Sequence, residues 1–330
     1  QGVSSAASDV YKRQTILSES KAAVSSGVTT VCYMPDTQPV IDTPAQIKLV
    51  EEIFKDTNLC KVKVLASLTK GLEGSSLSPM AELKQAGAIA LTNCLNPIKD
   101  PLVLRRAMEY ATGQDITIFY QPQNNYLANN GCVHEGKISG KLGLPGIPSA
   151  AESVAVAEAI LLSKLTNSRL HLCRVSCLES LMLIQNAQSE GLPVTSDVAI
   201  HQLFFDESSI DNFNSDFHVM PPFRSNEDLV ALHQAVKKET ITAICSDHQP
   251  HNEDAKQAPF SDTQPGISSI ELLLPLLMEL VELKIIDMSV AIAKVTSNPS
   301  EILGIDAGVI AKGLPADLCI IKKELSLIHI

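Results

Sequence analysis

The sequence lacks a surplus of basic residues, a long apolar run and a secretion leader, and each absence excludes a class of protein. Its 330 residues include 26 lysines and arginines against 37 aspartates and glutamates, a formal net charge of −11. This charge argues against a nucleic-acid-binding surface and against attraction to an anionic membrane. The longest apolar-rich stretch, Ile267 to Ile286, is broken by four charged residues and a proline, so it predicts a buried helix rather than a membrane span. No basic n-region followed by an apolar h-region opens the chain, so secretion is not indicated.

The sequence also shows no disulfide framework, no internal repeat and no glycine-rich phosphate loop. Eight scattered cysteines in a chain of 35.5 kDa are typical of a reducing cytosol, so we expect a cytoplasmic protein. With 45% hydrophobic and 19% charged residues, the chain can form a sizeable core, and long disordered stretches are not expected. The length suits either two domains or a single α/β barrel.

Both ends of the chain differ from its body. Residues 1–14 are rich in serine and alanine without periodicity, and residues 325–330 break off where a strand pattern ends. We expect both segments to be non-native additions and leave them out of the fold prediction. The alternative is that they are ordinary frayed termini.

Between these ends, short β-branched runs alternate with helical patterns, which is typical of βαβ units and a parallel sheet. Seven strands are predicted, at 28–34, 62–68, 88–92, 116–120, 170–175, 194–199 and 241–246. Helices are predicted at 16–25, 44–54, 80–85, 103–111, 150–165, 178–189 and 228–238.

A helix precedes the first of these strands, yet no strand precedes that helix. Eight parallel strands close a barrel, so the pattern predicts an α/β fold, a (β/α)8 TIM-type barrel over residues 15–305 with its N-terminal strand missing. A doubly wound open sheet is the alternative, but no switch point can be located for it. Residues 308–321 predict two short strands around a turn at 313–316, so we assign 306–324 to the start of a small appended β segment.

In a barrel, the reactive groups lie at the carboxyl ends of the strands. The richest of these ends is the last, SDHQPH at Ser246 to His251. Asp247 suits a metal ligand or general base, and His251 suits a substrate contact; the plainer interpretation is a capping aspartate and two surface histidines. Other strand ends offer Asn93, Tyr120 and Arg174, which are a poor ligand, a protonated phenol and a permanent cation. We therefore expect no divalent metal at this site.

Six segments, in matching order and spacing, resemble the dihydroorotases of the amidohydrolase superfamily. They are MPDTQPVIDTP (34–44), GKLGLPGIP (140–148), MPPFRSNED (220–228), SDHQPH (246–251), PFSDTQPGISSIELLLPL (259–276) and TSNPSEILGI (296–305). The resemblance covers residues 15–322, nearly the whole chain. It implies a metal-dependent amidohydrolase-type barrel with a flanking β-sandwich, of which 306–324 would be the start, and the interconversion of carbamoyl aspartate and dihydroorotate in pyrimidine synthesis.

Residue by residue, the resemblance reveals departures at the metal site. The family's His-x-His strand has no counterpart in this sequence. Where active members have a bridging aspartate and two ligand histidines, this chain has Asn93, Tyr120 and Arg174. The family's substrate-binding asparagine is replaced by Asp36, whose charge would oppose a carboxylate substrate, and a second asparagine is replaced by Met220.

Three family positions are kept. Asp247 stands at the catalytic aspartate, and His251 and Gly266 stand near the substrate position. The losses, together with segments such as SDVAIHQL (196–203) and DAKQAPF (254–260), match the non-catalytic dihydroorotase homologues that accompany aspartate carbamoyltransferase in some bacteria. In that branch the kept residues would be vestigial.

The resemblance therefore implies a cytoplasmic pseudoenzyme of pyrimidine biosynthesis that scaffolds the aspartate carbamoyltransferase catalytic subunit in a hetero-oligomer. We expect no cofactor and no nucleic-acid or membrane partner. The alternative is an active metal-dependent cyclic amidohydrolase that binds zinc and uses Asp247 as base. A third possibility is a barrel with neither role.

One further hypothesis concerns Arg174, which we expect to pair with Asp247 and to supply the positive charge that the lost metal once gave. Cys173 and Cys177 are expected to be buried and inert. The remaining histidines fit no ligand spacing, although His201 comes closest to a role because it ends a strand. They are His134, His171, His201, His218 and His233.

Overall fold

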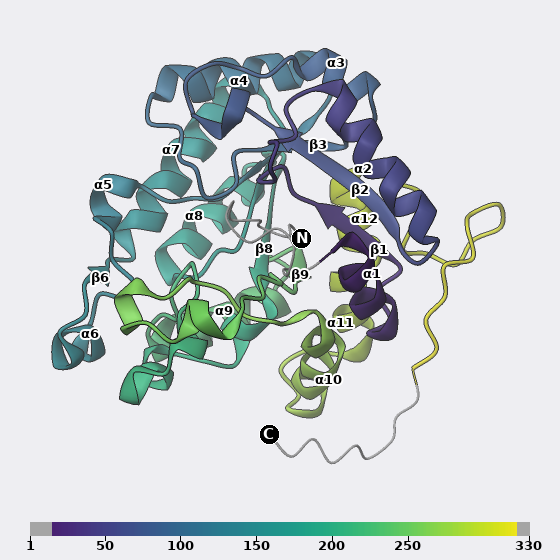
Figure 1. Ribbon diagram of the computed structural model, residues 1–330. Coiled ribbons are helices and arrows are strands. Elements are labelled where there is room, and N and C mark those ends of the chain that lie inside the picture. The colour runs from purple at the N-terminus through teal and green to yellow at the C-terminus, as the bar shows by residue number, and fades with distance from the viewer. Residues whose placement is uncertain (1–14, 322–330) are drawn as a thin grey trace.

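The computed structural model describes residues 15–321 and contains a parallel sheet of seven strands that curls round, with helices covering its outside (Figure 1). This is the predicted α/β arrangement of TIM-barrel type. Neighbouring strands follow the chain in the order β1-β2-β3-β4-β7-β8-β9, and every pair is parallel. The order contains no reversal, so the doubly wound alternative, which requires one, is excluded. The strands are β1 (Thr30–Tyr33), β2 (Lys61–Ser67), β3 (Ala90–Thr92), β4 (Thr117–Tyr120), β7 (Leu170–Leu172), β8 (Val194–Ala199) and β9 (Ala243–Cys245).

Helices begin where the sequence supplies caps. Helix α2 (Pro44–Thr57) starts with a capping box formed by Thr43 and Gln46 and has proline in its first turn. Helix α9 (Asn226–Lys237) starts with a capping box of Ser225 and Asp228. The other helices that pack on the sheet are α1 (Ile16–Ser25), α3 (Met80–Gln85), α4 (Pro101–Gly113), α7 (Ala150–Thr166) and α8 (Leu178–Ser189).

The seven predicted strands all form, and their ends differ from the prediction by at most three residues. The largest difference is at β7, predicted over 170–175 and observed at Leu170–Leu172. The seven predicted helices form as well. The reason is that these strands are short runs of apolar and β-branched residues buried under amphipathic helices, which is the clearest pattern a parallel sheet can leave in a sequence.

Several smaller elements were not predicted. Between β4 and α7 the chain forms a separate two-stranded parallel sheet and two short helices, and two further helices come near the end of the described chain. Strands of two residues carry no detectable periodicity, which explains why they were missed. These elements are α5 (Asn125–Ala128), β5 (Val133–His134), α6 (Lys137–Leu142), β6 (Gly146–Ile147), α11 (Met288–Val295) and α12 (Ser297–Leu303). The buried helix predicted within 267–286 forms as α10 (Leu273–Glu282).

The sheet has two end strands within residues 15–321, β1 and β9, which are not paired with each other. The carboxyl ends of all seven strands point the same way because every pair is parallel. Side chains at these ends, and side chains that line the space between β1 and β9, are therefore the ones to consider for a functional site.

The segment after α12 corrects one prediction. The two strands expected at 308–321 do not form: residues 305–321 contain a turn at 312–313 and no strand, and most of them are exposed. A strand requires a partner for its backbone hydrogen bonds, and no described segment pairs with this one. The segment instead runs along the outside, where Lys61 and Asp317 form an ion pair at 2.5 Å. The predictions for residues 1–14, 322–324 and 325–330 fall outside the described residues.

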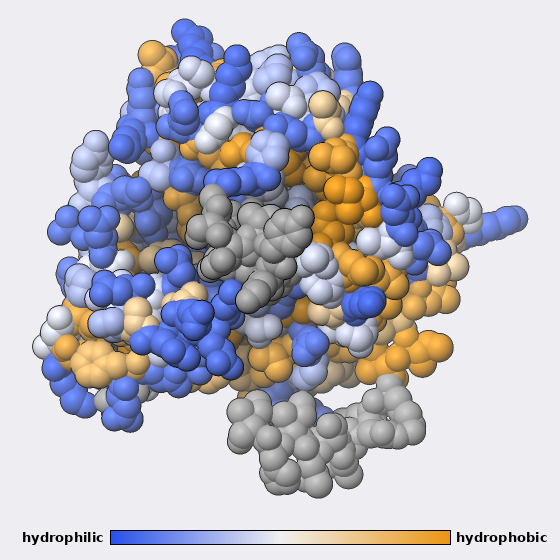
Figure 2. All heavy atoms as spheres, viewed as in Figure 1, coloured by the Kyte–Doolittle hydropathy of each residue, from blue (hydrophilic) through white to orange (hydrophobic). Residues whose placement is uncertain are grey.

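Hydrophobic side chains gather on the face where α2 and the segment following α12 lie (Figure 2). Exposed apolar residues there include Leu49, Ile53, Ile310 and Ile320. No helix formed by the described residues has both the length and the apolar character needed to cross a bilayer.

Candidate functional site

A cavity of about 670 Å³ opens between β1 and β9 and reaches the carboxyl ends of the strands. Its lining includes three charged residues that the sequence analysis singled out, Asp36, Arg174 and Asp247, together with Asp197. Among the predicted site residues, the cavity thus brings together Asp36, Arg174 and Asp247.

Arg174 follows β7 and lies at the centre of this site. Its Nη1 donates to Asp247 Oδ1 at 2.7 Å, and its Nε donates to Gln121 Oε1 at 2.5 Å. Its backbone N–H donates to Asp197 Oδ1 at 2.7 Å. The side chains of Arg174 and Asp247 are only 13% and 6% exposed. The predicted ion pair between Arg174 and Asp247 is confirmed.

The backbone at both ends of this ion pair is unusual. Arg174 has φ +54° and Asp247 has φ +48°, in the left-handed region that side chains other than glycine rarely adopt. Such conformations persist only where surrounding contacts determine them, and they concentrate at functional sites. They aim both side chains from their strand ends toward each other.

Electrostatics hold the guanidinium charged. Burial alone would lower the pKa of Arg174, but the facing carboxylate of Asp247, together with contributions from Cys173 and Cys245, outweighs it, so the pKa of Arg174 lies above its usual value. Gln249 Nε2 donates to the same Asp247 oxygen at 2.7 Å. The buried cation and anion are therefore paired and hydrogen-bonded, which is the condition for tolerating them in an interior.

Asn93 does not line this cavity. Its side chain accepts from Thr69 Oγ1 at 2.7 Å and donates to the carbonyl oxygen of Asn96 at 2.8 Å. The next residue, Cys94, does line the cavity. Both residues follow the last residue of β3, and Cys94 has φ +52°.

At the end of β4, too, the residue next to the predicted one makes the contact in the site. Tyr120 lies in the hydrophobic core, and burial, with a contribution from Glu158, raises the pKa of its phenol above the usual value. It does not line the cavity. The neighbouring residue, Gln121, makes the contact with Arg174. The inner position at this strand end is thus held by an amide.

Asp36 follows β1, and its carboxylate is buried with incomplete hydrogen bonding. Its Oδ1 is buried and has no hydrogen-bond partner among the described residues. Burial raises the pKa of Asp36, while its own backbone and the charge of Arg174 lower it. A second carboxylate therefore shares the field of the same guanidinium.

His251 and Gly266 lie next to each other in the loop beyond β9. His251 Nε2 hydrogen-bonds the carbonyl oxygen of Pro265 at 2.9 Å. Gly266 has φ +145°, and a Cβ there would lie 2.5 Å from the carbonyl oxygen of Gln249 and 2.8 Å from His251 Nε2. Glycine is required at this position because the backbone approaches so closely. Neither residue is part of the cavity lining.

The residues at the family's metal positions do not fit a divalent cation. Beside Asp247, the place of a cation is taken by the Arg174 guanidinium at 2.7 Å, and the uncharged amide of Gln121 contacts that guanidinium from the end of β4. A guanidinium has no lone pair to offer and repels a second cation. The buried charges at these strand ends are joined by the ion pair between Arg174 and Asp247.

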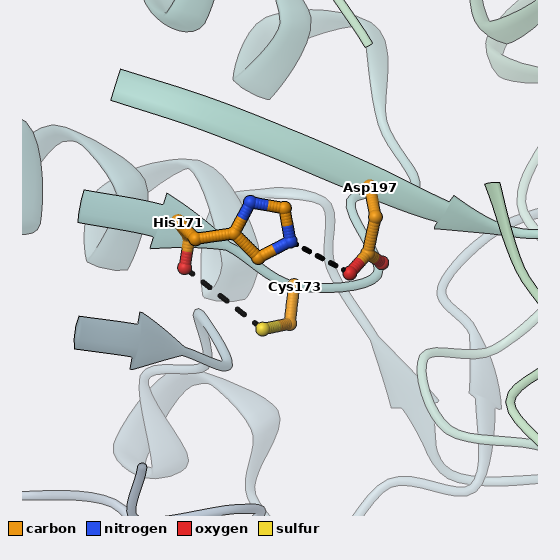
Figure 3. A group of neighbouring side chains, drawn as sticks. All are labelled: His171, Cys173 and Asp197. Carbon is orange, nitrogen blue, oxygen red and sulfur yellow. Dashed lines mark hydrogen bonds and ion pairs between the residues drawn. The ribbon is translucent and has the colours of Figure 1, made fainter. Parts of the chain in front are cut away.

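Sequence reasoning missed a group of side chains deeper between β7 and β8. Ligand atoms of His171, Cys173 and Asp197 all lie within 4.8 Å of one another (Figure 3). The alternation of side chains along a strand could have indicated part of this group, because residues 171 and 173 lie on one face of β7 and its extension. His201, the histidine closest to a predicted role, is buried and packs edge-on against Phe223 at 5.7 Å.

Known proteins resemble this chain along most of its length. Residues 6–180 match the family model described as dihydro-orotase-like. A dihydroorotase-like protein of Pseudomonas putida is 42% identical over 325 residues, covering 98% of this chain and 77% of the relative. A dihydroorotase of Pelobacter propionicus is 36% identical over 313 residues, covering 95% of this chain and 74% of the relative.

Solved structures agree on the fold. The L-hydantoinase (dihydropyrimidinase) from Arthrobacter aurescens superposes with a TM-score of 0.80 at 20% identity, covering 90% of this chain and 68% of that one. The dihydropyrimidinase from Brevibacillus agri NCHU1002 gives a TM-score of 0.76 at 20% identity, covering 92% and 69%. These neighbours confirm the amidohydrolase-type barrel. With the family match over residues 6–180 and relatives aligned along more than nine tenths of its length, the chain belongs to the dihydroorotase-like family.

Proposed function

We propose that this protein is a catalytically inactive dihydroorotase homologue of the cytoplasm that scaffolds the catalytic subunit of aspartate carbamoyltransferase in a hetero-oligomer. The observation that carries the inactive part is the buried ion pair between Arg174 and Asp247. An aspartate that acts as a base must be free to accept a proton from a reacting group. Here the Oδ1 of Asp247 accepts from both Arg174 and Gln249.

The surroundings of the pair support the same proposal. A dihydroorotate-like substrate carries a carboxylate, and its place near Arg174 is shared with Asp36, whose Oδ1 is buried without a partner among the described residues. Two carboxylates facing one guanidinium leave no excess positive charge to attract an anion. The site is therefore arranged to be stable by itself rather than to bind a charged substrate.

The scaffold part rests on the family resemblance and on the relatives. The two relatives named dihydroorotase-like protein, from Pseudomonas putida and Pseudomonas aeruginosa, are 42% and 40% identical to this chain. The relative named dihydroorotase from Pelobacter propionicus is 36% identical. We infer a structural partner, since a barrel retained without its chemistry still offers a folded surface.

The test uses the purified full-length protein, alone and co-expressed with the transferase catalytic subunit. We expect hydrolysis of dihydroorotate and cyclisation of carbamoyl aspartate to stay at the background of an Asp247→Asn variant, with or without added zinc. We also expect the transferase to co-elute with this protein in size-exclusion chromatography. Turnover above the Asp247→Asn background would overturn the inactive assignment in favour of an active cyclic amidohydrolase, and separate elution would overturn the scaffold.

A further inference from the structure

A compact donor group lies inside the barrel, one layer below the ion pair. His171 belongs to β7, Cys173 follows it, and Asp197 belongs to β8, where the register pairs His171 with Thr195 and Leu172 with Ser196. Alternation along the strands then turns residues 171, 173, 195 and 197 to one face. The donor atoms of His171, Cys173 and Asp197 lie within 4.8 Å of one another (Figure 3).

The chemistry of this group suits a borderline-soft cation. An imidazole nitrogen, a thiolate sulfur and a carboxylate oxygen are the three kinds of ligand that Zn²⁺ takes in proteins, and it prefers four of them in a tetrahedron. A second thiol lies nearby: Cys245 Sγ is 3.4 Å from Asp197 Oδ1, outside the group whose donor atoms all lie within 4.8 Å of one another. We propose that His171, Cys173 and Asp197 form a structural Zn²⁺ site in the barrel interior, with Cys245 as fourth donor once its side chain turns toward the other three.

Contacts around the donors already orient them. Thr195 Oγ1 lies 2.8 Å from His171 Nδ1, which leaves Nε2 directed at Asp197 Oδ2 at 2.9 Å. Metal-binding imidazoles typically have their other nitrogen held by such a hydrogen bond. Asp197 is fixed in turn by the backbone N–H of Arg174. The Cys173 thiol has only a weak partner, the His171 carbonyl oxygen at 3.9 Å, so little is lost when it turns to a metal.

Proton balance follows from the same contacts. Cys173 and Cys245 each carry a thiol proton because burial raises the pKa of both thiols. On binding, the metal displaces these two protons, which leave to solvent, and bonds form to the two sulfurs, to the Asp197 carboxylate and to His171 Nε2. The metal-bound imidazole stays neutral with its remaining proton on Nδ1, where Thr195 Oγ1 lies within hydrogen-bonding distance. A coordinating thiol is deprotonated outright by the cation.

A metal ion can reach the proposed site, and the nearby positive charge is neutralised. All four donors line the cavity of about 670 Å³, which provides an entry path. The positive charge of Arg174 is offset by its ion pair with Asp247. The site does not depend on the proposed function, because it lies below the strand-end position at which the family's metal chemistry would act and offers no open position beside Asp247.

The test loads the purified full-length protein with Co²⁺ or Zn²⁺ after chelation. We expect about one equivalent of tightly held metal per chain and, for Co²⁺, an intense sulfur-to-cobalt charge-transfer band in the near ultraviolet. Cys173→Ser should abolish that band and lower the stoichiometry. Cys177→Ser is the matched control, because Cys177 is equally buried but caps α8 and contacts Ser180 at 3.1 Å.

A second variant guards against misfolding of the first. Thr195→Val keeps the side-chain volume and all four donors but removes the contact to His171 Nδ1, so we expect zinc affinity to fall by about 10–100-fold with the cobalt band retained. Cobalt-loaded wild-type protein without the charge-transfer band would overturn the site, and so would equal affinity in wild type and Thr195→Val. None of these readouts depends on turnover, so they fail or succeed separately from the proposed function.

Discussion

Arg174 shows how one substitution can turn a reactive site into a structural one. Its guanidinium donates to Asp247 and Gln121, and its backbone N–H donates to Asp197. Arg174 therefore connects the end of β7 with three other strands. Breaking a buried pair by removing one partner leaves an uncompensated charge, whereas replacing both partners with apolar groups is often neutral. The ion pair therefore contributes specificity of structure more than net stability.

At the residue scale, we predict that Arg174→Met lowers the free energy of unfolding by about 3–5 kcal/mol, because it leaves the Asp247 carboxylate buried without its cationic partner. The double variant Arg174→Met with Asp247→Leu should recover most of that loss. Urea denaturation of the three proteins measures this.

The matched control is Lys164→Ala, which breaks the exposed pair with Glu190 at 2.6 Å. A pair at the surface contributes about 0–1 kcal/mol, so this variant should remain close to wild type. Equal losses for Arg174→Met and Lys164→Ala would show that an Asp247 carboxylate without its partner does not carry the cost expected of a buried charge.

At the element scale, a single carboxylate connects two helices. Asp228 Oδ2 accepts from the backbone N–H of Ser225 at 3.1 Å, which closes the capping box of α9, and also from the Ser225 hydroxyl at 2.6 Å. Its Oδ1 accepts from the backbone N–H of Leu178, the first residue of α8, at 2.9 Å. Both helix N-termini are thus satisfied by one buried side chain.

We predict that Ser225→Ala destabilises the protein by about 1 kcal/mol, the usual cost of a lost N-cap. Asp228→Ala should cost about 2–3 kcal/mol, because it removes both caps and leaves buried N–H groups without partners. Glu227→Ala, at the adjacent exposed position, is the control and should be nearly neutral. The urea midpoints of the three variants decide the order, and an Asp228→Ala loss no larger than that of Ser225→Ala would contradict the double cap.

Elements of this fold differ in how well the sequence predicts them. β8, predicted and observed at 194–199, is buried at five of its six positions and follows closely after the end of a helical pattern, which makes it easy to locate. β5 and β6 have two residues each, too few for any period, and the segment at 308–321 has strand-like residues but no partner strand. Strand pairing is a property of the tertiary structure, so an isolated run of β-branched residues cannot establish it.

Site residues could be predicted from the sequence where a single strand end contains a recognisable motif. They could not be predicted where residues from two strands come together only through the register of those strands. Asp247 stands in a distinctive local motif. Asn93 and Tyr120 do not line the cavity, whereas their neighbours Cys94 and Gln121 line it or contact Arg174, and a sequence pattern cannot decide between adjacent positions at a strand end. His171 and Asp197 are separated by 26 residues, and only the register of β7 with β8 brings them together.

At the scale of the whole molecule, two buried histidines couple folding to acidity. Burial lowers the pKa of His201 to about 4, and neither ring nitrogen has a hydrogen-bond partner among the described residues. Burial, followed by the nearby Lys256 and His251, likewise lowers the pKa of His218 to about 4. Both rings are neutral in the folded protein at pH values where the unfolded chain, with an ordinary pKa of about 6.5, is protonated.

The direction of the effect follows from proton binding. Between about pH 6.5 and pH 4 the unfolded chain binds more protons than the folded one, so the free energy of unfolding falls as the pH falls through this window. Below about pH 4 both states are protonated and the loss levels off, and above about pH 7 these two groups contribute no slope. For His201 alone, lowering the pH from about 7 to about 5 should cost about 2 kcal/mol.

We therefore predict that His201→Leu flattens the pH dependence of stability, because the substituted side chain cannot bind the proton that favours unfolding. Urea denaturation at pH 7 and at pH 5 measures the slope for wild type and variant. At pH 7 the leucine has the same apolar contacts, including Phe223, so the variant serves as its own reference there. A wild-type stability that is unchanged between the two pH values, or a slope that His201→Leu leaves intact, would place the origin of acid sensitivity elsewhere in the chain.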